Sequence, residues 1–306
     1  VSDKTGVVEL AKELVALDFE IVSTGGTFHA ITEAGVPATY VSEVTGFPEV
    51  LGGRVKTLHP FIHGGILAMR NEEHLAQLKE LGIQPIDLVV VNLYPFRQTI
   101  AKEGVTLAEA IENIDIGGPS MVRAAAKNHK DVLIVVNPSR YGEIVKMLKN
   151  GEVDYATRLD LAQEAFRHTA EYDTYISKYL QQVTGKRLLF PETALLAGAK
   201  RQELRYGENP HQQAAFYRMP EATGACVANA KQLQGKELSF NNIVDIHAAL
   251  ELVREFPQPA AVVIKHTNPC GVAIGKDALD AYCRAFAADP ISAFGGIVGM
   301  NRVVDG

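Results

Sequence analysis

Apolar positions in the first half of the chain alternate between the spacing of helices and that of strands. Between positions 7 and 15 they recur at three- and four-residue steps, which predicts a helix. Near-continuous apolar runs at 86–91 and 131–136 predict strands buried in a parallel sheet. Further expected elements are a strand at 19–22, an extended segment at 37–44, and helices at 28–33, 72–81, 141–148 and 155–180. The alternation predicts an α/β fold with a parallel sheet and helices on both faces, the last helix being scaffold and a linker between domains.

The pattern of residue types along the chain changes from about residue 186. The stretch 204–212, LRYGENPHQ, is polar, turn-rich and aromatic, and predicts a loop. Beyond it the pattern predicts a helix at 243–254, a buried strand at 260–264 and a glycine turn at 292–296.

Composition limits the class of protein. With 306 residues, 47% hydrophobic and 22% charged, and no apolar run long enough to cross a bilayer, the chain is expected to form about two globular domains. The net charge of −6 argues against nucleic-acid binding and allows small anionic substrates. Cys226, Cys270 and Cys283 form neither a disulfide framework nor a zinc pattern, so a cytoplasmic location is expected. Because the chain opens on Val1 at a loop-like stretch, we expect a preceding segment.

Two predicted helix starts near the beginning of the chain have the composition of a phosphate site. Small polar residues and a lysine precede the first helix, and a glycine turn follows the strand at 19–22. Free backbone N–H groups at helix starts bind anions, and glycine lets a ligand approach the backbone closely. The candidate residues are Ser2, Lys4, Ser23, Gly25, Gly26 and Thr27. A glycine-rich turn without a ligand is the alternative.

The tract RVKTLHP at 54–60 combines two cations, a hydroxyl and an imidazole. Such a tract is poorly suited to a helix and costly to bury without a charged ligand, which favours an active-site loop over a solvated basic turn. The strand at 86–91 is followed by Asn92-Leu93-Tyr94-Pro95. Ligands of parallel sheets lie beyond the carboxyl ends of such strands, which places this segment at the site. The candidates are Arg54, Lys56, Thr57, Asn92 and Tyr94. A Tyr–Pro exit that only packs is the alternative.

The stretch 114–129, IDIGGPSMVRAAAKNH, places a carboxylate before a predicted helix start. Pro119 is tolerated in a first helical turn, and Gly117 lets the backbone approach a ligand. Asp115 would then lie at an oxyanion seat, with Lys127 near the far end of the helix. An ordinary capped helix with a surface lysine is an equally good alternative.

A Lys–His pair follows the predicted strand at 260–264. Lys265 and His266 would offer a proton donor and a base near neutral pH. Cys270 nearby is a weaker candidate, because no Cys–His–carboxylate spacing accompanies it. The loop at 204–212 is a second candidate ligand loop, with a structural turn as its alternative.

Nine tracts in order resemble a known family. They are SDKTG, STGGT, TGFPEVLGGRVKTLHP, VVVNLYPF, ENIDIGGPSMVRAAAKNH, LRYGENPHQQAAFY, GKELSFNNI, IKHTNPCGVA and DPISAFGG, and they span nearly the whole chain. Together they are similar to the bifunctional purine-biosynthesis enzymes that combine phosphoribosylaminoimidazolecarboxamide (AICAR) formyltransferase with IMP cyclohydrolase. STGGT alone would also fit methylglyoxal synthase or the regulatory domain of carbamoyl-phosphate synthetase, which share the cyclohydrolase fold.

The resemblance implies a methylglyoxal-synthase-like parallel-sheet domain over residues 1–187 that closes the formamido nucleotide FAICAR into IMP. By motif match, the catalytic candidates are Lys56, Tyr94, Asp115 and Lys127. The nucleotide would be lined by Ser2, Lys4, Ser23, Gly25, Gly26, Thr27, Arg54, Thr57, Asn92, Ile116 and Gly117. Asp115 and a lysine would share the proton transfers while the helix start and a lysine face the developing oxyanion. Because a helix rises about 1.5 Å per residue, Lys127 lies some 12 Å from Pro119, and its role depends on the helix's placement or on a neighbouring subunit.

For residues 188–306 the resemblance implies the first part of a cytidine-deaminase-like α/β transformylase domain without the zinc. That domain would transfer a formyl group from the cosubstrate 10-formyltetrahydrofolate to AICAR. Lys265 and His266 match its catalytic pair, and Arg205, Tyr206 and Gly295 match substrate-side positions. The family's transformylase continues beyond Gly306, so we expect cyclohydrolase elements but no competent transformylase in this chain. Homodimers are expected from the resemblance, and binding of a monovalent cation stays open.

Two rival functions fit part of the same sequence. A methylglyoxal-synthase-like phosphate lyase and a nucleotide-sensing regulatory domain both explain STGGT. Neither explains RVKTLHP together with KHTNPCG, so the purine-enzyme resemblance is the stronger hypothesis.

Overall fold

The structure is a computed structural model that describes residues 1–151, 153–185, 191–220 and 222–305. It divides into two compact units, Val1–Leu195 and Leu196–Gly306. The predicted domain boundary between residues 187 and 188 lies outside the described residues.

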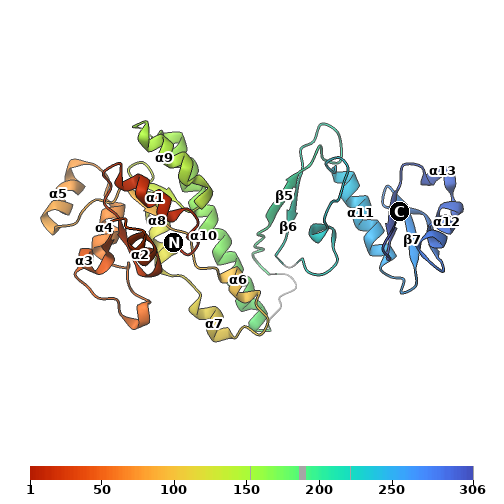
Figure 1. The fold of residues 1–306 in the computed structure, drawn as a ribbon, viewed down its shortest axis with the longest axis horizontal. Helices are drawn as coiled ribbons and strands as arrows, with labels where there is room; N and C mark the ends of the chain where they lie inside the picture. The colour runs from red at the N-terminus through yellow and green to blue at the C-terminus, as the bar shows by residue number, and fades with distance from the viewer. Residues whose placement is uncertain (152, 186–190, 221, 306) are drawn as a thin grey trace. The chain divides into compact units, whose positions relative to one another are not determined.

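Short parallel strands surrounded by helices build the first unit (Figure 1). Its strands are β1 (Val22–Ser23), β2 (Thr39–Tyr40), β3 (Leu88–Val90) and β4 (Leu133–Val135). Its helices are α1 (Val7–Val15), α2 (Gly25–Glu33), α3 (Val41–Thr45), α4 (Pro60–Leu67), α5 (Glu72–Leu81), α6 (Phe96–Ile100), α7 (Leu107–Glu112), α8 (Gly117–Lys127), α9 (Tyr141–Lys149) and α10 (Tyr155–Val183), with 3-10 turns η1 (Leu51–Gly53) and η2 (Pro138–Arg140). Strand β1 pairs with β2 and β3 with β4, both parallel, which confirms the predicted pairing mode within two separate two-stranded sheets.

The core of the first unit holds the start of α8 in place. All three residues of β4 are buried, and Val122 and Ala125 of α8 are fully buried. Helix α10 packs against both α8 and β4, with Leu161 and Ala165 inside the core. Helix α10, which was predicted to be a scaffold, is therefore an integral part of the first unit.

Some local predictions were wrong. The segment 37–44 is extended only at β2, because the Glu43 carboxylate accepts the Tyr40 N–H at 3.1 Å and caps a helix, α3, at that point. Helices α4, α6 and α7 had not been predicted. They are five to eight residues long, too short to show a helical repeat of apolar positions.

Antiparallel sheets organise the second unit. Its strands are β5 (Ala199–Glu203), β6 (Ala215–Arg218), β7 (Ala260–Lys265), β8 (Asn268–Ile274) and β9 (Ile297–Met300), and its helices are α11 (Phe240–Val253), α12 (Ala278–Ala288) and α13 (Pro290–Ala293), with the 3-10 turn η3 (Val227–Asn229). Strands β5 and β6 form a hairpin, and β7 lies between β8 and β9. Alternate residues of β7 face opposite sides of the sheet: Val262 and Ile264 pack with α11, and Ala261 and Val263 pack with α12.

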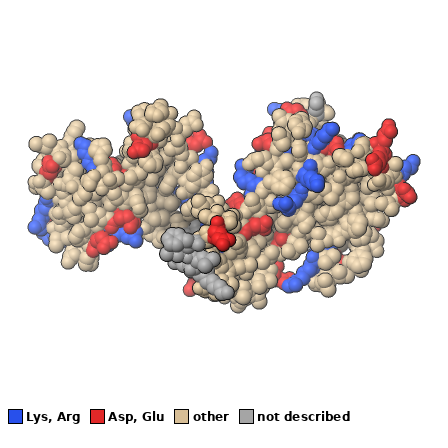
Figure 2. Space-filling view, turned by 180° about the vertical axis from the view of Figure 1, so that it is seen from behind, with Lys and Arg blue, Asp and Glu red and all other residues tan. Residues whose placement is uncertain are grey.

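Charges of both signs are interspersed on the surface seen in Figure 2. Within the described ranges, no helix is long and apolar enough to span a membrane. The same ranges contain no group of three or more His, Cys, Asp or Glu side chains placed to hold a metal ion.

Candidate active site

The glycine turn after β1 becomes the first turn of α2. Gly25 adopts a positive φ of 46°, and helix α2 begins there rather than at Phe28. The side chain of Lys4 lies over this start, since a Cβ built on Gly26 would be 3.5 Å from Lys4 Cε and 3.7 Å from Nζ. An ammonium group therefore borders a glycine-rich helix start, as the phosphate prediction requires.

Asn92 ties the N-terminal loop to the end of β3. Its buried amide oxygen accepts the N–H groups of Ser2 and Asp3 at 2.6 and 2.8 Å, and its Nδ2 donates to the Asp3 carbonyl at 2.9 Å. The Thr27 hydroxyl donates to the Val1 carbonyl at 3.0 Å. Asn92 is thus a positioning residue that fixes Ser2 and, through the loop, Lys4.

Lys56 belongs to the loop after η1, and its side chain reaches the start of α2: a Cβ built on Gly25 would be 3.9 Å from Lys56 Nζ. Its ammonium group is 3.0 Å from a carboxylate oxygen of Glu49, and the Glu49 carboxylate also accepts the Tyr40 hydroxyl. Burial lowers the pKa of Lys56, but the hydrogen bond and charge of Glu49, aided by the phenols of Tyr94 and Tyr40, outweigh it and raise the pKa overall. Lys56 is therefore suited to remain charged, to bind an anion or to donate a proton.

Asp115 lies at the mouth of α8, as predicted. Its Oδ1 accepts the Gly118 N–H at 2.9 Å, and its own N–H donates to the Tyr172 hydroxyl at 2.8 Å. Burial raises the pKa of Asp115, although hydrogen bonds from the backbone of Gly118 and Tyr94 lower it in part. A half-buried carboxylate with a raised pKa is a stronger proton acceptor than a surface aspartate.

Thr57 connects the basic loop to α8. A Cβ built on Gly117 would be 2.9 Å from Thr57 Oγ1, so the glycine allows this close approach. Arg54 is instead exposed and paired with Glu112 at 2.5 Å, and Ile116 is 58% exposed. The guanidinium of Arg54 is therefore engaged by Glu112 at the surface of the unit.

The contacts described above bring most of the predicted first-unit residues to one edge, where β1, β3, α2 and α8 meet. Tyr94 is exposed at this edge and also lines a cavity of about 610 Å³ together with Ser2 and Asn92. The residues joined by these contacts are Ser2, Lys4, Gly25, Gly26, Thr27, Lys56, Thr57, Asn92, Tyr94, Asp115 and Gly117. Ser23 ends β1 one residue before the cap of α2.

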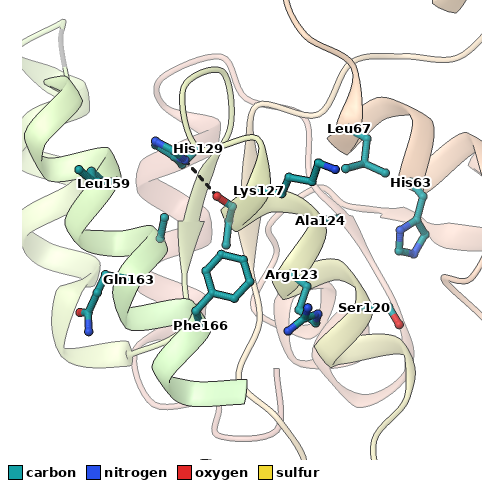
Figure 3. A pocket seen from close by; sticks show the side chains of 12 residues that line it. His63, Leu67, Ser120, Arg123, Ala124, Lys127, His129, Leu159, Gln163 and Phe166 are labelled. Carbon is teal, nitrogen blue, oxygen red and sulfur yellow. Dashed lines mark hydrogen bonds between the residues drawn. The ribbon is translucent and has the colours of Figure 1, made fainter. Parts of the chain in front are cut away.

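Lys127 lies elsewhere. It is exposed in the last turn of α8, whose start carries Gly117. Figure 3 shows it in a groove of about 670 Å³ between α4, α8 and α10, lined also by His63, Arg123 and Phe166. This groove shares no lining residue with the Asp115 edge. Lys127 and Asp115 are thus separated by the length of α8, as the helical rise predicts, and they lie at two different places in the first unit.

In the second unit, His266 is placed by a strained turn. His266 and Thr267 are the two central residues of the β7–β8 hairpin and have φ values of 52° and 63°. Asp245 of α11 accepts both their backbone N–H groups, at 3.3 and 2.7 Å. Lys265 donates to the carbonyl of Phe294 at 3.0 Å, beside the predicted Gly295. The strand that was expected at 260–264 therefore includes Lys265 and turns directly into β8.

The first turn of α11 holds the other second-unit candidates. Arg205 donates to Asn242 at 3.3 Å, and its guanidinium carbon lies 5.5 Å from the centre of the Tyr206 ring. Asn242 and Asp245 are three residues apart, so they share one face of α11. One helix face thus contacts both the loop at 204–212 and the Lys265–His266 turn.

Sequence reasoning missed four residues at these two places: Glu49, Tyr40, Tyr172 and Asp245. Glu49 had a local signal, because it is the acidic residue of the tract TGFPEVLGGRVKTLHP that also carries two cations. Tyr172 had none, since it is 57 residues from Asp115 in the chain.

Comparison with known proteins gives two family matches. The family described as "AICARFT/IMPCHase bienzyme" matches residues 125–306, and the family described as "MGS-like domain" matches residues 6–120. The chain is 61% identical over 312 residues to the "Bifunctional purine biosynthesis protein PurH" of Desulfitobacterium hafniense (strain DSM 10664 / DCB-2), and 58% identical over 307 residues to that of Bacillus mycoides (strain KBAB4). Both alignments cover 100% of this chain, which spans 60% of each relative's length.

A solved structure is also similar. The protein of "Crystal structure of ForH" shares 37% sequence identity with this chain at a TM-score of 0.54. The match covers 57% of this chain and 91% of that one.

Proposed function

The chain belongs to the AICARFT/IMPCHase bienzyme family, and we propose that its first unit closes FAICAR into IMP with loss of water. The single observation that carries this proposal is the convergence of Lys56, Tyr94 and Asp115 on one edge between two glycine-opened helix starts. The rival functions, a phosphate lyase and a nucleotide-sensing domain, do not require that arrangement.

Ring closure moves two protons. The carboxamide nitrogen of FAICAR attacks the formyl carbon and forms the new C–N bond. The carboxamide nitrogen and the formamido nitrogen each give up one proton, and the formyl oxygen receives both and leaves as water. Asp115, whose pKa burial raises, is the proposed proton acceptor, and Lys56 stabilises and protonates the departing oxygen.

The phosphate of the nucleotide has a proposed seat at the start of α2. Lys4 and the N–H groups after Gly25 supply positive charge and donors there. Ser2, Ser23 and Thr27 add hydroxyl groups, and Arg54 and Thr57 approach from the loop after η1. No nucleic-acid or membrane partner is required by this function.

The second unit is proposed to carry part of the AICAR transformylase site. His266 would accept the proton of the AICAR amine while Lys265 assists departure of the folate nitrogen of 10-formyltetrahydrofolate. Arg205, Tyr206 and Gly295 would contact substrate. The links of Arg205 and Tyr206 to the start of α11, and the bond from Lys265 to the Phe294 carbonyl beside Gly295, support that grouping. The proposed cellular site is the cytoplasm.

Lys127 is proposed to act in a homodimer. Because it lies apart from the Asp115 edge of its own chain, it can assist ring closure only from a second copy. Mixing inactive Asp115→Asn chains with inactive Lys127→Met chains tests this: shared sites restore activity, and a mixture as inactive as its parts contradicts the proposal.

Incubating the chain with FAICAR and following IMP absorbance tests the function itself. We expect turnover without added folate. Binding of FAICAR without turnover would favour a sensing domain, and release of phosphate from a triose phosphate would favour a lyase.

A further inference from the structure

A small closed loop places Glu49 opposite Lys56. Val50 and Val55 form an antiparallel bridge, with N–H···O distances of 3.3 and 3.4 Å in the two directions. The residues just outside the bridge, Glu49 and Lys56, then face each other across the loop entrance, 3.0 Å apart at their charged atoms.

The loop inside this bridge is conformationally demanding. Leu51, Gly52 and Gly53 all have positive φ, at 57°, 65° and 87°. Leucine in this region is strained by about 1 kcal/mol or more. A Cβ built on Gly53 would be 2.9 Å from Lys56 Cε, so a glycine at this position leaves room for the lysine side chain. The strained turn thus leaves the Lys56 ammonium beside the Glu49 carboxylate.

Glu49 has a second partner on the other side. The Tyr40 hydroxyl donates to its Oε1, and the oxygen of that same hydroxyl accepts the Gly25 N–H at 3.4 Å. A continuous line of contacts therefore runs from the ammonium of Lys56 through Glu49 and Tyr40 to the first residue of α2.

We propose that Glu49 is a positioning residue for ring closure, which holds the Lys56 ammonium charged and in place and holds Tyr40 against the start of α2. This inference rests on the proposed cyclohydrolase function and deepens it. It gives a physical basis for the role proposed above for Lys56, which donates a proton while Asp115 accepts one.

The charges around the pair agree with this assignment. The groups that act on Lys56 are Glu49, Tyr94 and Tyr40, and those that act on Glu49 are Tyr40 and Lys56. The hydrogen bond from Tyr40 is the main cause of the lowered pKa of Glu49, with Lys56 adding to it against the effect of burial. Both members of the pair are thus ionised at neutral pH.

Three variants separate charge from shape. Glu49→Gln keeps an oxygen that can accept the Tyr40 hydroxyl but removes the charge beside Lys56. Glu49→Ala removes both, and Tyr40→Phe removes the hydroxyl that contacts both Glu49 and Gly25 while keeping the Glu49 charge beside Lys56. Glu80→Gln, an exposed change on α5, is the matched control.

We expect Glu49→Gln to lower kcat for IMP formation by roughly 10- to 100-fold with a smaller change in KM. The alkaline limb of its pH profile should move to lower pH, because Lys56 loses the charge that keeps it protonated. Glu49→Ala should be lower still, and Tyr40→Phe should lower kcat with a smaller shift of the alkaline limb than Glu49→Gln, because Glu49 acts more strongly on Lys56 than Tyr40 does. A Glu49→Gln enzyme with kcat within about twofold of the parent and an unmoved limb would overturn the inference.

A second measurement does not depend on turnover. The rate at which Lys56 is acetylated, followed by peptide mass against pH, reports how much of the amine is uncharged. Glu49→Gln should shift that profile to lower pH, and Glu80→Gln should not. Failure of the parent chain to turn over FAICAR would contradict the proposed function, whereas an unshifted acetylation profile would contradict the role of Glu49.

Discussion

The two candidate sites are held together by different means. In the first unit, Asp115, Lys56 and Asn92 are half-buried or buried. Asp115 and Asn92 are held by residues distant in the chain, and Lys56 is paired with Glu49. In the second unit, His266 and Arg205 are exposed, and His266 is placed by a strained hairpin turn that one carboxylate holds. Buried, over-determined groups have shifted pKa values suited to proton transfer, whereas exposed groups on a turn depend on the geometry of that turn.

The comparison is tested most severely by Asp115→Asn. Loss of the proton acceptor should lower the rate of ring closure by about 10²- to 10⁴-fold, since the amide cannot take up the proton. IMP binding, measured by calorimetry, should stay measurable. Asp18→Asn, an exposed change where φ is 62° and asparagine is tolerated, is the control. Near-normal turnover of Asp115→Asn would remove the assignment.

A methyl group at Gly118 should disturb the same carboxylate without removing it. A Cβ there would lie 2.4 Å from Asp115 Oδ2 and 2.9 Å from Leu93 Cδ2, so the side chain of Asp115 must shift. We expect Gly118→Ala to reduce turnover about 10- to 100-fold and to lower the free energy of unfolding by about 1–3 kcal/mol. Gly142→Ala in α9 adds the same methyl group where no atom lies within 4 Å. Equal effects at the two glycines would show that Asp115 tolerates displacement.

These experiments concern features that the sequence predicted in type and order, although α2 begins at Gly25 rather than Phe28 and β1 covers Val22–Ser23 rather than 19–22. The glycine-opened starts of α2 and α8 and the ends of β1 and β3 were recognisable because strand, turn and helix composition are local. Residues that meet only after folding could not be found in this way. Tyr172 reaches Asp115 across 57 residues, and Asp245 reaches Thr267 across 22.

The strands were also longer in prediction than in the structure. The apolar run at 86–91 became a three-residue β3, because only Leu88–Val90 pair with β4, and within the run only Val89 is buried. The separation of Lys127 from Asp115 was predictable, because an unbroken helix fixes the rise between its two ends.

In the second unit, Asp245→Ala should loosen the turn that carries His266. Losing an acceptor for two backbone N–H groups should lower the free energy of unfolding by about 1–3 kcal/mol and change the NMR shifts of His266. Thr267→Gly should restore part of the loss, because glycine adopts a φ of 63° without strain. Glu255→Ala, exposed after α11, is the control. A stable Asp245→Ala chain with unchanged His266 signals would contradict the role of Asp245.

The smallest expected effect is a pH dependence of stability in the first unit. Burial lowers the pKa of His168 below its usual value, despite the opposing charges of Glu171 and Glu164, and the neutral ring accepts the Leu93 N–H at 3.4 Å. The unfolded chain therefore binds a proton at higher pH than the folded chain. Stability is complete above about pH 6.5 and declines as the pH falls from there toward the folded pKa. Because the ring is only half-buried, we expect this decline to stay below about 1 kcal/mol.

His168→Gln keeps an oxygen acceptor for Leu93 but cannot titrate, so its urea midpoint should depend less on pH between 7 and 5 than that of the parent chain. His29→Gln, exposed on α2, should keep the parental dependence. If both variants follow the parent, the acid sensitivity of the first unit has its source elsewhere. His63, whose pKa burial also lowers and whose buried Nε2 has no partner in the described chain, would then be the next residue to replace.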